Sequence, residues 1–167
     1  MKVICVTGTP GTGKTTIAKK LAKKLDFYYL DVNESIKKHK LSEGYDKIRK
    51  TRIVNIKKLN RFLINYIKQF KNLNKKFNGI VIDSHLSHYL PRKYADFCIV
   101  TKCNIKELNK RLKKKKFHKG KIQENIQAEI FDVCCNEAVE IKHNVIVVDT
   151  TKGFNINKIL EQMKFKC

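Results

Sequence analysis

One segment, Gly8–Thr15 with the sequence GTPGTGKT, restricts this chain more than any other feature because it fits the pattern G-x-x-x-x-G-K-[ST]. The apolar, strand-like run Lys2–Thr7 precedes it, and an amphipathic helical pattern, Lys14–Leu25, follows it. In that setting the backbone N–H groups of the loop turn inward around a phosphate, and the first turn of the helix adds the positive end of its dipole. Lys14 can then reach the outer phosphates of a nucleotide, and the Thr15 hydroxyl can bind Mg²⁺. The alternative, a chance glycine-rich turn, would not need both flanking elements.

The remaining chain alternates between strand-like and helix-like segments. A length of 167 residues suits one domain, and alternating elements are arranged most simply as a parallel sheet with helices on both faces. No apolar run is long enough for a membrane helix. Glu43-Gly44 predicts a turn, and the lysine-rich stretch Leu108–Lys121, which lacks an apolar period at its centre, is typical of a mobile loop. Further strands are expected at 27–30, 80–82, 97–101 and 144–148, and helices at 31–40, 55–77, 105–113, 122–141 and 156–163.

Three candidate functional side chains, Asp83, His85 and His88, follow the apolar strand Ile80–Ile82. Asp83 stands where a carboxylate emerges at the carboxyl edge of a parallel sheet, and there it can hold Mg²⁺ directly or through water. The alternative for Asp83 is a cap on the following segment. His85 could orient an attacking water or an acceptor hydroxyl, and the sequence leaves this equal to a histidine on a surface loop. For His88 the surface loop is the favoured interpretation.

The net charge of +22 comes from 37 Lys and Arg against 15 Asp and Glu, and only five of the basic residues are Arg. Two interpretations stay open: attraction to polyanions such as RNA and nucleotides, and a lysine-rich surface produced by an AT-rich coding sequence. The densest run of cations is Arg111 with Lys113–Lys119. It suits a lid that closes over phosphate, a contact with an RNA backbone, or a solvated surface, and composition does not separate the three.

The six cysteines show no paired C-x-x-C spacing, and several lie in apolar segments, where a free Cys behaves as a small hydrophobic residue. The chain enters a strand-like run at once, without the charged and apolar regions of a secretory signal. We therefore expect reduced thiols, no zinc site, no membrane association and a cytoplasmic protein.

Four motifs, taken in order, resemble those of one known group. They are GTPGTGKTT at 8–16, EGYD at 43–46, IVIDSHLSHYLP at 80–91 and NIQAEIF at 125–131. Over about its whole length the chain resembles the nuclear, ribosome-associated adenylate kinase family, which is the sixth adenylate kinase isoform of animals, and its archaeal relatives. The resemblance implies a single P-loop NTPase domain over 1–167, a three-layer α/β/α fold with a five-stranded parallel sheet like that of nucleoside monophosphate kinases. It also implies a monophosphate-binding segment at about 31–54 and a lid at about 114–124.

The resemblance implies a reaction and roles for individual residues. The reaction is the Mg²⁺-dependent conversion of ATP and AMP, or another nucleoside monophosphate, into two diphosphates, accompanied by ATP hydrolysis. Asp83 and His85 fall on the family's D-x-H, which carries metal and catalysis, Lys115 lies in the catalytic lid, and Lys152 matches a position near the adenine. The implied partner is universal small-subunit ribosomal protein eleven, late in subunit maturation. A transient contact with small ribosomal subunit RNA is a further expectation, which rests on the positive charge of the chain. The residues expected to bind the ATP phosphates are Gly11, Thr12, Gly13, Lys14, Thr15 and Thr16.

The chain departs from the family pattern in two places. Where the family lid has Arg-Gly-Tyr, this chain has Lys115-Lys116-Phe117, which keeps the charge but not the planar fork of an arginine. The segment after EGYD is acidic in the animal relatives and basic here, at positions 47, 49, 50 and 52. Three hypotheses follow: a nucleoside monophosphate kinase, an assembly ATPase whose acceptor is water, and another small-molecule kinase on the same scaffold. The motifs beyond the phosphate loop argue against the third.

Overall fold

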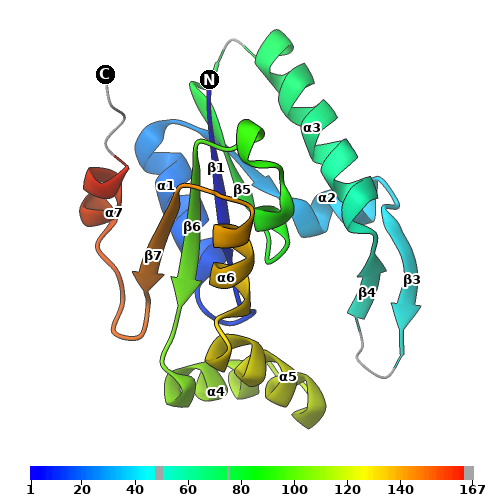
Figure 1. The fold of residues 1–167 in the computed structure, drawn as a ribbon, viewed down its shortest axis with the longest axis vertical. Coiled ribbons are helices and arrows are strands. Elements are labelled where there is room, and N and C mark those ends of the chain that lie inside the picture. The colour runs from blue at the N-terminus through cyan, green and yellow to red at the C-terminus, as the bar shows by residue number, and fades with distance from the viewer. Residues whose placement is uncertain (48–50, 75, 164–167) are drawn as a thin grey trace.

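The computed structural model describes residues 1–47, 51–74 and 76–163. Its centre is a five-stranded sheet with the strand order β2-β5-β1-β6-β7, in which every neighbouring pair is parallel (Figure 1). The predicted parallel sheet is therefore confirmed. The strands are β1 (Lys2–Gly8), β2 (Tyr28–Asp31), β5 (Gly79–Asp83), β6 (Phe97–Lys102) and β7 (Val145–Asp149).

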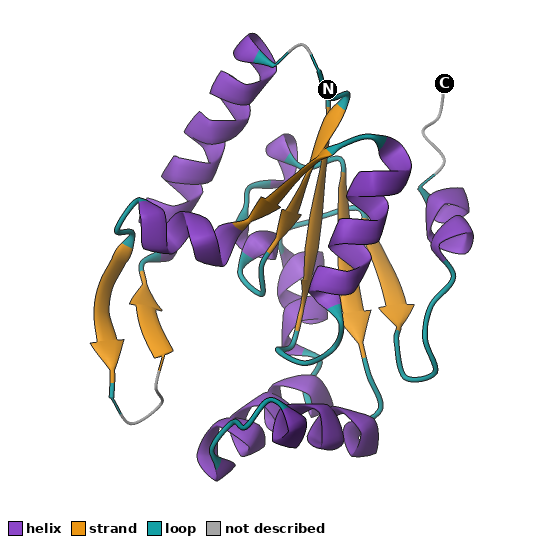
Figure 2. Ribbon diagram, turned by 180° about the vertical axis from the view of Figure 1, so that it is seen from behind, coloured by secondary structure: helices purple, strands orange, loops and turns teal. Residues whose placement is uncertain are grey.

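Helices cover both faces of this sheet, which confirms the three-layer architecture (Figures 1 and 2). Two clusters of buried apolar side chains hold the layers together, one against each face. Because the central strands are buried on both sides, they read as continuous apolar runs rather than as alternating ones. The first cluster involves α2 (Val32–Lys38), α3 (Ile56–Leu73) and α6 (Val133–Glu140), and the second involves α1 (Lys14–Leu25) and α7 (Ile156–Gln162).

A helical hairpin of α4 (Ile105–Lys114) and α5 (Lys119–Ile130) lies beyond the carboxyl end of the sheet (Figure 1). It has a small core of its own, in which Leu108 and Leu112 are fully buried. The expectation of a mobile-loop segment at 108–121 is therefore wrong. The apolar period of this core is hard to see in the sequence because its members come from the segment before α4, from both helices and from the turn: Cys103, Leu108, Leu112, Phe117, Ile122 and Ile126.

The predicted helix at 122–141 is two helices. Asp132 interrupts it by adopting a left-handed conformation, with φ of 53°, between the end of α5 and the start of α6. Lys102 at the end of β6 forms an ion pair with it, with 2.8 Å between Lys102 Nζ and Asp132 Oδ2. Non-glycine residues rarely adopt this conformation. Because the residue at the break is Asp, the sequence has no Gly or Pro there that would indicate the end of a helix.

The region of the predicted turn at Glu43-Gly44 is a β-hairpin, β3 (Ser42–Asp46) paired with β4 (Thr51–Val54). It extends away from the main sheet beside α3 (Figure 1). Residues 48–50 of the expected monophosphate segment, including basic positions 49 and 50, lie outside the described residues, as does Cys167.

Three of the described cysteines, Cys5, Cys98 and Cys103, are buried in apolar clusters, as expected of small hydrophobic side chains. Within the described ranges, no helix combines the length and the hydrophobicity that a membrane span requires.

Candidate active site

The phosphate loop connects the end of β1 to the start of α1 and needs its glycines for two reasons. Gly11 and Gly13 have φ values of +98° and +96°, which L side chains rarely adopt. Gly11 also packs closely against the hairpin of α4 and α5, since a Cβ there would lie 2.9 Å from Leu108 Cδ1 and 3.0 Å from Leu112 Cδ2. The loop is thus a tight cradle that rests on α4.

Thr12 serves this loop internally. Its hydroxyl donates to the Thr9 carbonyl at 2.7 Å and lies 2.6 Å from the Thr101 hydroxyl, and its carbonyl accepts a hydrogen bond from Thr150 Oγ1. Because hydrogen bonds inside the protein engage the hydroxyl, the N–H and the carbonyl of Thr12, its expected contact with phosphate stays a prediction.

Lys14, the first residue of α1, points back over the loop. Its ammonium group donates to the carbonyls of Gly8 at 2.8 Å and Thr9 at 2.9 Å. Burial lowers the pKa of Lys14 to about 8, which Cys134 and Asp83 partly oppose and Lys115 reinforces. The two carbonyls hold the cation where a nucleotide phosphate would be a stronger partner.

Asp83 ends β5 and is buried, and the structure brings it to the same site as the loop. In the sheet it lies opposite Val6 of β1 and Asp31 of β2. Tyr29 donates its hydroxyl to Asp83 Oδ2 at 2.9 Å, and burial together with this carboxylate raises the pKa of Tyr29 well above its usual value. Tyr29 therefore stays protonated and fixes the orientation of the carboxylate.

His85 keeps an exposed edge although protein surrounds much of its ring. Desolvation by these surroundings, followed by the charge of Lys14, lowers the pKa of His85 to about 4. The exposed edge moderates the effect, but its direction leaves the imidazole neutral at pH 7. A neutral, accessible imidazole beside Lys14 can accept a proton or orient a nucleophile.

His88 is buried, so the favoured expectation of a surface histidine is wrong. Its Nδ1 lies 2.7 Å from the Thr7 hydroxyl, its Nε2 lies 2.9 Å from Glu137 Oε2, and Tyr89 donates to the other oxygen of Glu137. Burial lowers the pKa of His88. The neutral ring accepts a hydrogen bond from Thr7 at the end of β1 and donates one to Glu137 of α6, so it connects the strand to that helix.

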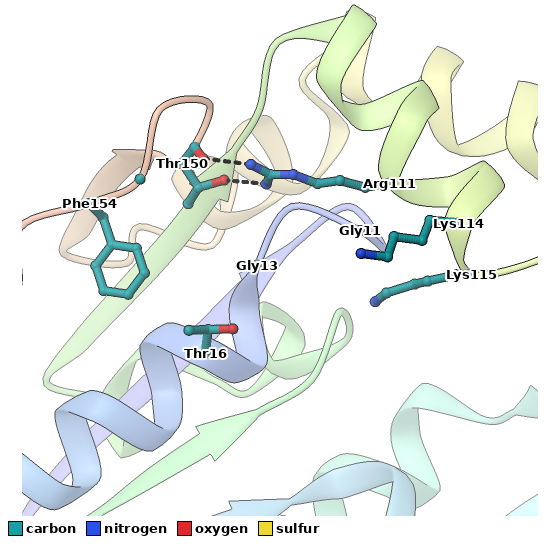
Figure 3. Close-up of a pocket in the computed structure, with 9 residues that line it drawn as sticks. Gly11, Gly13, Thr16, Arg111, Lys114, Lys115, Thr150 and Phe154 are labelled. Carbon is teal, nitrogen blue, oxygen red and sulfur yellow. Dashed lines mark hydrogen bonds between the residues drawn. The ribbon is translucent and has the colours of Figure 1, made fainter.

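A pocket of about 600 Å³ opens between the phosphate loop, α4 and the loop after β7 (Figure 3). Arg111 forms one wall: its two terminal nitrogens donate to Thr150 Oγ1 at 3.1 Å and the Thr150 carbonyl at 2.8 Å, and its Nε pairs with Glu107. In Figure 3 the side chains of Lys114 and Lys115 extend beside Gly11, while Phe154 faces the pocket from the other side. Cations, glycines and an aromatic ring therefore surround one cavity.

Comparisons with known proteins agree with this geometry. Residues 4–132 match the family model described as AAA domain. A protein of Methanocaldococcus jannaschii named "Putative adenylate kinase" is 36% identical over 166 residues, covering 98% of this chain and 86% of that protein. "Adenylate kinase isoenzyme 6 homolog FAP7" of Saccharomyces cerevisiae is 36% identical over 147 residues, covering 87% of this chain and 71% of that protein. This chain belongs to the adenylate kinase isoenzyme 6 family.

Solved structures show the same fold at low sequence identity. The deoxyadenosine kinase from M. mycoides with bound dATP has a TM-score of 0.58 and 16% identity, and covers 99% of this chain and all of that chain. A sugar kinase from Janibacter sp. has a TM-score of 0.60 and 17% identity over 97% of this chain and 91% of that chain. These structures support the P-loop fold of this adenylate kinase isoenzyme 6 relative.

Of the remaining sequence-predicted positions of this family member, Thr15 and Thr16 lie at the rim of the site and Lys152 lies beside it. Thr15 and Thr16 begin α1 with exposed side chains, and Thr16 lines the pocket. Lys152 lies outside that pocket, in an adjacent hollow of about 270 Å³ shared with Asn104 and Asp149. Its neighbour Gly153 borders both cavities, whereas Lys152 lines the smaller one, so the predicted contact of Lys152 with adenine stays a prediction.

The donor set fits a metal that arrives with its nucleotide. Within the described ranges, no group of three or more His, Cys, Asp or Glu could hold a metal ion. The Thr15 hydroxyl is exposed at the start of α1, and the Asp83 carboxylate ends β5. Hydroxyl and carboxylate oxygens are ligands that Mg²⁺ takes alongside substrate phosphates.

Proposed function

We propose that this chain is an adenylate kinase-like nucleoside monophosphate kinase, which converts Mg·ATP and AMP, or another monophosphate, into two diphosphates. The pocket of about 600 Å³ carries the proposal, because it joins the glycines of the phosphate loop to Lys114 and Lys115 of the hairpin. Phosphoryl transfer depends mostly on positioning the reactants and neutralising charge. A cradle and mobile cationic side chains on two sides of one cavity are suited to that task.

The side chains at this pocket have complementary roles. Lys14 exchanges its two carbonyl partners for the nucleotide phosphates, and Lys115 adds positive charge from the lid. Thr15 and Asp83 would hold Mg²⁺, which neutralises phosphate charge when bound. Arg111 and Phe154 offer planar faces to the base, and their lack of hydrogen-bond selectivity favours a loose base preference.

The acceptor monophosphate is assigned to the segment at about 31–54. Asp31 caps α2 by accepting from the N–H groups of Asn33 and Glu34 at 2.8 and 3.2 Å, which leaves the helix start unsuited to a phosphate. The exposed cation Arg52 on β4 is the better candidate for phosphate contact. The hairpin that carries it extends toward the same end of the molecule as the lid (Figure 1).

ATP hydrolysis is the second activity that we assign to this site, and His85 is the observation that favours it. The imidazole is neutral and accessible, and it lies close enough to Lys14 for that cation to disfavour protonation of the ring. A group of this kind can orient a water molecule as readily as an acceptor hydroxyl. Without a bound monophosphate, water would take the acceptor's place.

The cellular role that we propose is a cytoplasmic one, late in the maturation of the small ribosomal subunit and its 16S-type RNA. The support is the family resemblance, and a net charge of +22 is compatible with contact with polyanions. The proposed partners are universal small-subunit ribosomal protein eleven and, transiently, small-subunit RNA. If hydrolysis dominates, the chain is an ATPase assembly factor whose main partner is the ribosomal protein.

Product stoichiometry tests the two activities. Purified protein is incubated with Mg·ATP, with and without AMP, and ADP, AMP and inorganic phosphate are resolved by chromatography. A monophosphate kinase forms two ADP for each AMP consumed and releases no phosphate, whereas an ATPase releases phosphate regardless of AMP. The Lys14→Met protein controls for contaminating enzymes. If the wild type produces neither ADP nor phosphate above that control, the proposed function is refuted.

A further inference from the structure

We propose that Glu129 is a positioning residue that links the lid helix α5 to the phosphate loop, so that ATP binding in the loop is transmitted to the lid. The inference deepens the proposed function and rests on it, because it assumes that the loop binds ATP. Glu129 lies near the carboxyl end of α5, in the NIQAEIF motif, and is more than nine-tenths buried.

The carboxylate of Glu129 is shared between two distant parts of the chain. Oε2 accepts the hydroxyl hydrogen of Thr9, the second residue of the phosphate loop, at 2.5 Å. Oε1 accepts the backbone N–H of Cys103, just beyond β6, at 2.8 Å. Two donors therefore point at one buried carboxylate, and hydrogen bonds to a carboxylate are stronger than those to a neutral acceptor.

Thr9 is the part of the loop that also holds Lys14. Its carbonyl accepts from Lys14 Nζ at 2.9 Å and from the Thr12 hydroxyl at 2.7 Å. Glu129 thus fixes the side chain of a residue whose backbone positions both the catalytic cation and the loop interior. When Lys14 leaves the Thr9 carbonyl for a phosphate, Thr9 loses one of the hydrogen bonds that hold its position. Glu129 is bonded directly to the Thr9 hydroxyl, so a movement of Thr9 acts on Glu129.

The other end of the same helical hairpin carries the lid cations. Lys114 and Lys115 end α4, and Lys119 and Lys121 begin α5. A second contact couples the hairpin to the loop, because Gly11 packs against the buried leucines of α4 with no space for a Cβ. Glu129 and Gly11 therefore join the hairpin to the loop at two points, one polar and one apolar, and a shift of the loop moves the helices that hold the lid cations.

The test compares Glu129→Gln with Glu140→Gln, which removes an exposed carboxylate from α6. Glutamine keeps the shape, but its amide can no longer accept from both Thr9 and Cys103. We expect the Kd for Mg·ATP, measured by calorimetry, to rise roughly tenfold in Glu129→Gln. The Kd for AMP should stay within about twofold, and Glu140→Gln should leave both unchanged.

A double-mutant cycle separates positioning from general damage. Thr9→Val removes the hydroxyl at nearly constant shape and also serves if Glu129→Gln fails to fold. Thr9→Ser keeps the hydroxyl and should retain wild-type ATP affinity. If the link is real, the Thr9→Val and Glu129→Gln double variant binds ATP about as weakly as either single variant. Additive losses, or an equal loss of AMP affinity, would overturn the proposal.

Hydrogen exchange tests transmission to the lid. In the wild type, ATP should slow exchange in both the loop and residues 119–130, whereas in Glu129→Gln only the loop should respond. Equal protection of 119–130 in both proteins, or unchanged ATP affinity in Glu129→Gln, contradicts the inference while leaving the proposed function intact. A wild type that binds no ATP refutes the proposed function itself.

Discussion

Replacing Lys14 by methionine should abolish phosphoryl transfer at almost no cost in stability. A pKa lowered from 10.5 to about 8 corresponds to roughly 3 kcal/mol for keeping the charged side chain in the folded protein. Because the residue is only half-buried by area, solvent screening reduces this to about 2 kcal/mol. The hydrogen bonds to the Gly8 and Thr9 carbonyls offset it by about 1 kcal/mol each. Methionine removes both contributions, so the free energy of unfolding at pH 7 should change by less than about 1 kcal/mol.

The same comparison should depend on pH in a defined direction. Below about pH 8 Lys14 is protonated in both the folded and the unfolded chain, and the full desolvation cost is present. Between about pH 8 and 10.5 the folded protein loses this proton first, so the unfolded chain binds more protons and wild-type stability rises. Methionine has no proton to lose. Relative to Lys14→Met, the wild type should gain about 2 kcal/mol between pH 7 and pH 10.

Urea unfolding of both proteins at pH 7, 8.5 and 10 measures this difference. Lys24→Met, an exposed substitution on the same helix, controls for the titration of the other lysines. The chromatographic assay should show at least a roughly 100-fold loss of transfer in Lys14→Met, because a preorganised charge at the phosphates is removed. A stability difference that is constant across pH would refute the desolvation of Lys14. Substantial residual turnover would refute its catalytic assignment.

Three further substitutions examine the base, the lid core and the sheet. His85→Gln should slow turnover roughly 100-fold. Because desolvation and Lys14 lower the pKa of His85, the wild-type rate should not halve near pH 6.5, the ordinary pKa of a histidine; a rate that halves there would contradict this. Leu112→Ala should cost about 2–5 kcal/mol in urea unfolding because the side chain is fully buried, and a cost below about 1 kcal/mol would mean that the hairpin core is loose. Gly79→Ala should lower the melting temperature because its Cβ would lie 2.4 Å from the ring of Phe27. The control Gly120→Ala in α5 should raise the melting temperature slightly, because a Cβ there meets only ordinary contacts and Ala favours a helix more than Gly does. Equal effects of the two substitutions would contradict the packing at Gly79.

The sheet and the phosphate loop were predictable because their signals are local. A buried parallel strand is a short apolar run, and the loop has a fixed spacing between Gly8 and Thr15. The lid hairpin was not predictable in the same way. Its core takes Leu108 and Leu112 from one helix and its other members from the segment before that helix, the turn and the next helix, so neither helix shows a wide apolar face.

The site was predictable only where a motif names the residue. Lys14, Asp83 and His85 follow from spacing, and the structure brings them together. Tyr29 and Arg111 act through partners 54 and 39 residues away, Asp83 and Thr150, and such separations leave no pattern in one sequence. His88 was misjudged for the same reason, since its burial depends on Thr7 and Glu137.

The acidic residues of this chain are more informative than its lysines. A coding bias toward lysine can produce a surface of high positive charge without any selection for a partner, so the value of +22 does not decide between the two interpretations. No such bias would place carboxylates within hydrogen-bond distance of particular donors around one loop. Yet three carboxylates do accept from specific donors: Asp83 from Tyr29, Glu129 from Thr9, and Glu137 from His88 and Tyr89. All three surround the phosphate loop or the strand that leads into it. In a chain with 15 acids against 37 cations, buried or half-buried carboxylates with specific donors are the charges whose positions require a functional explanation.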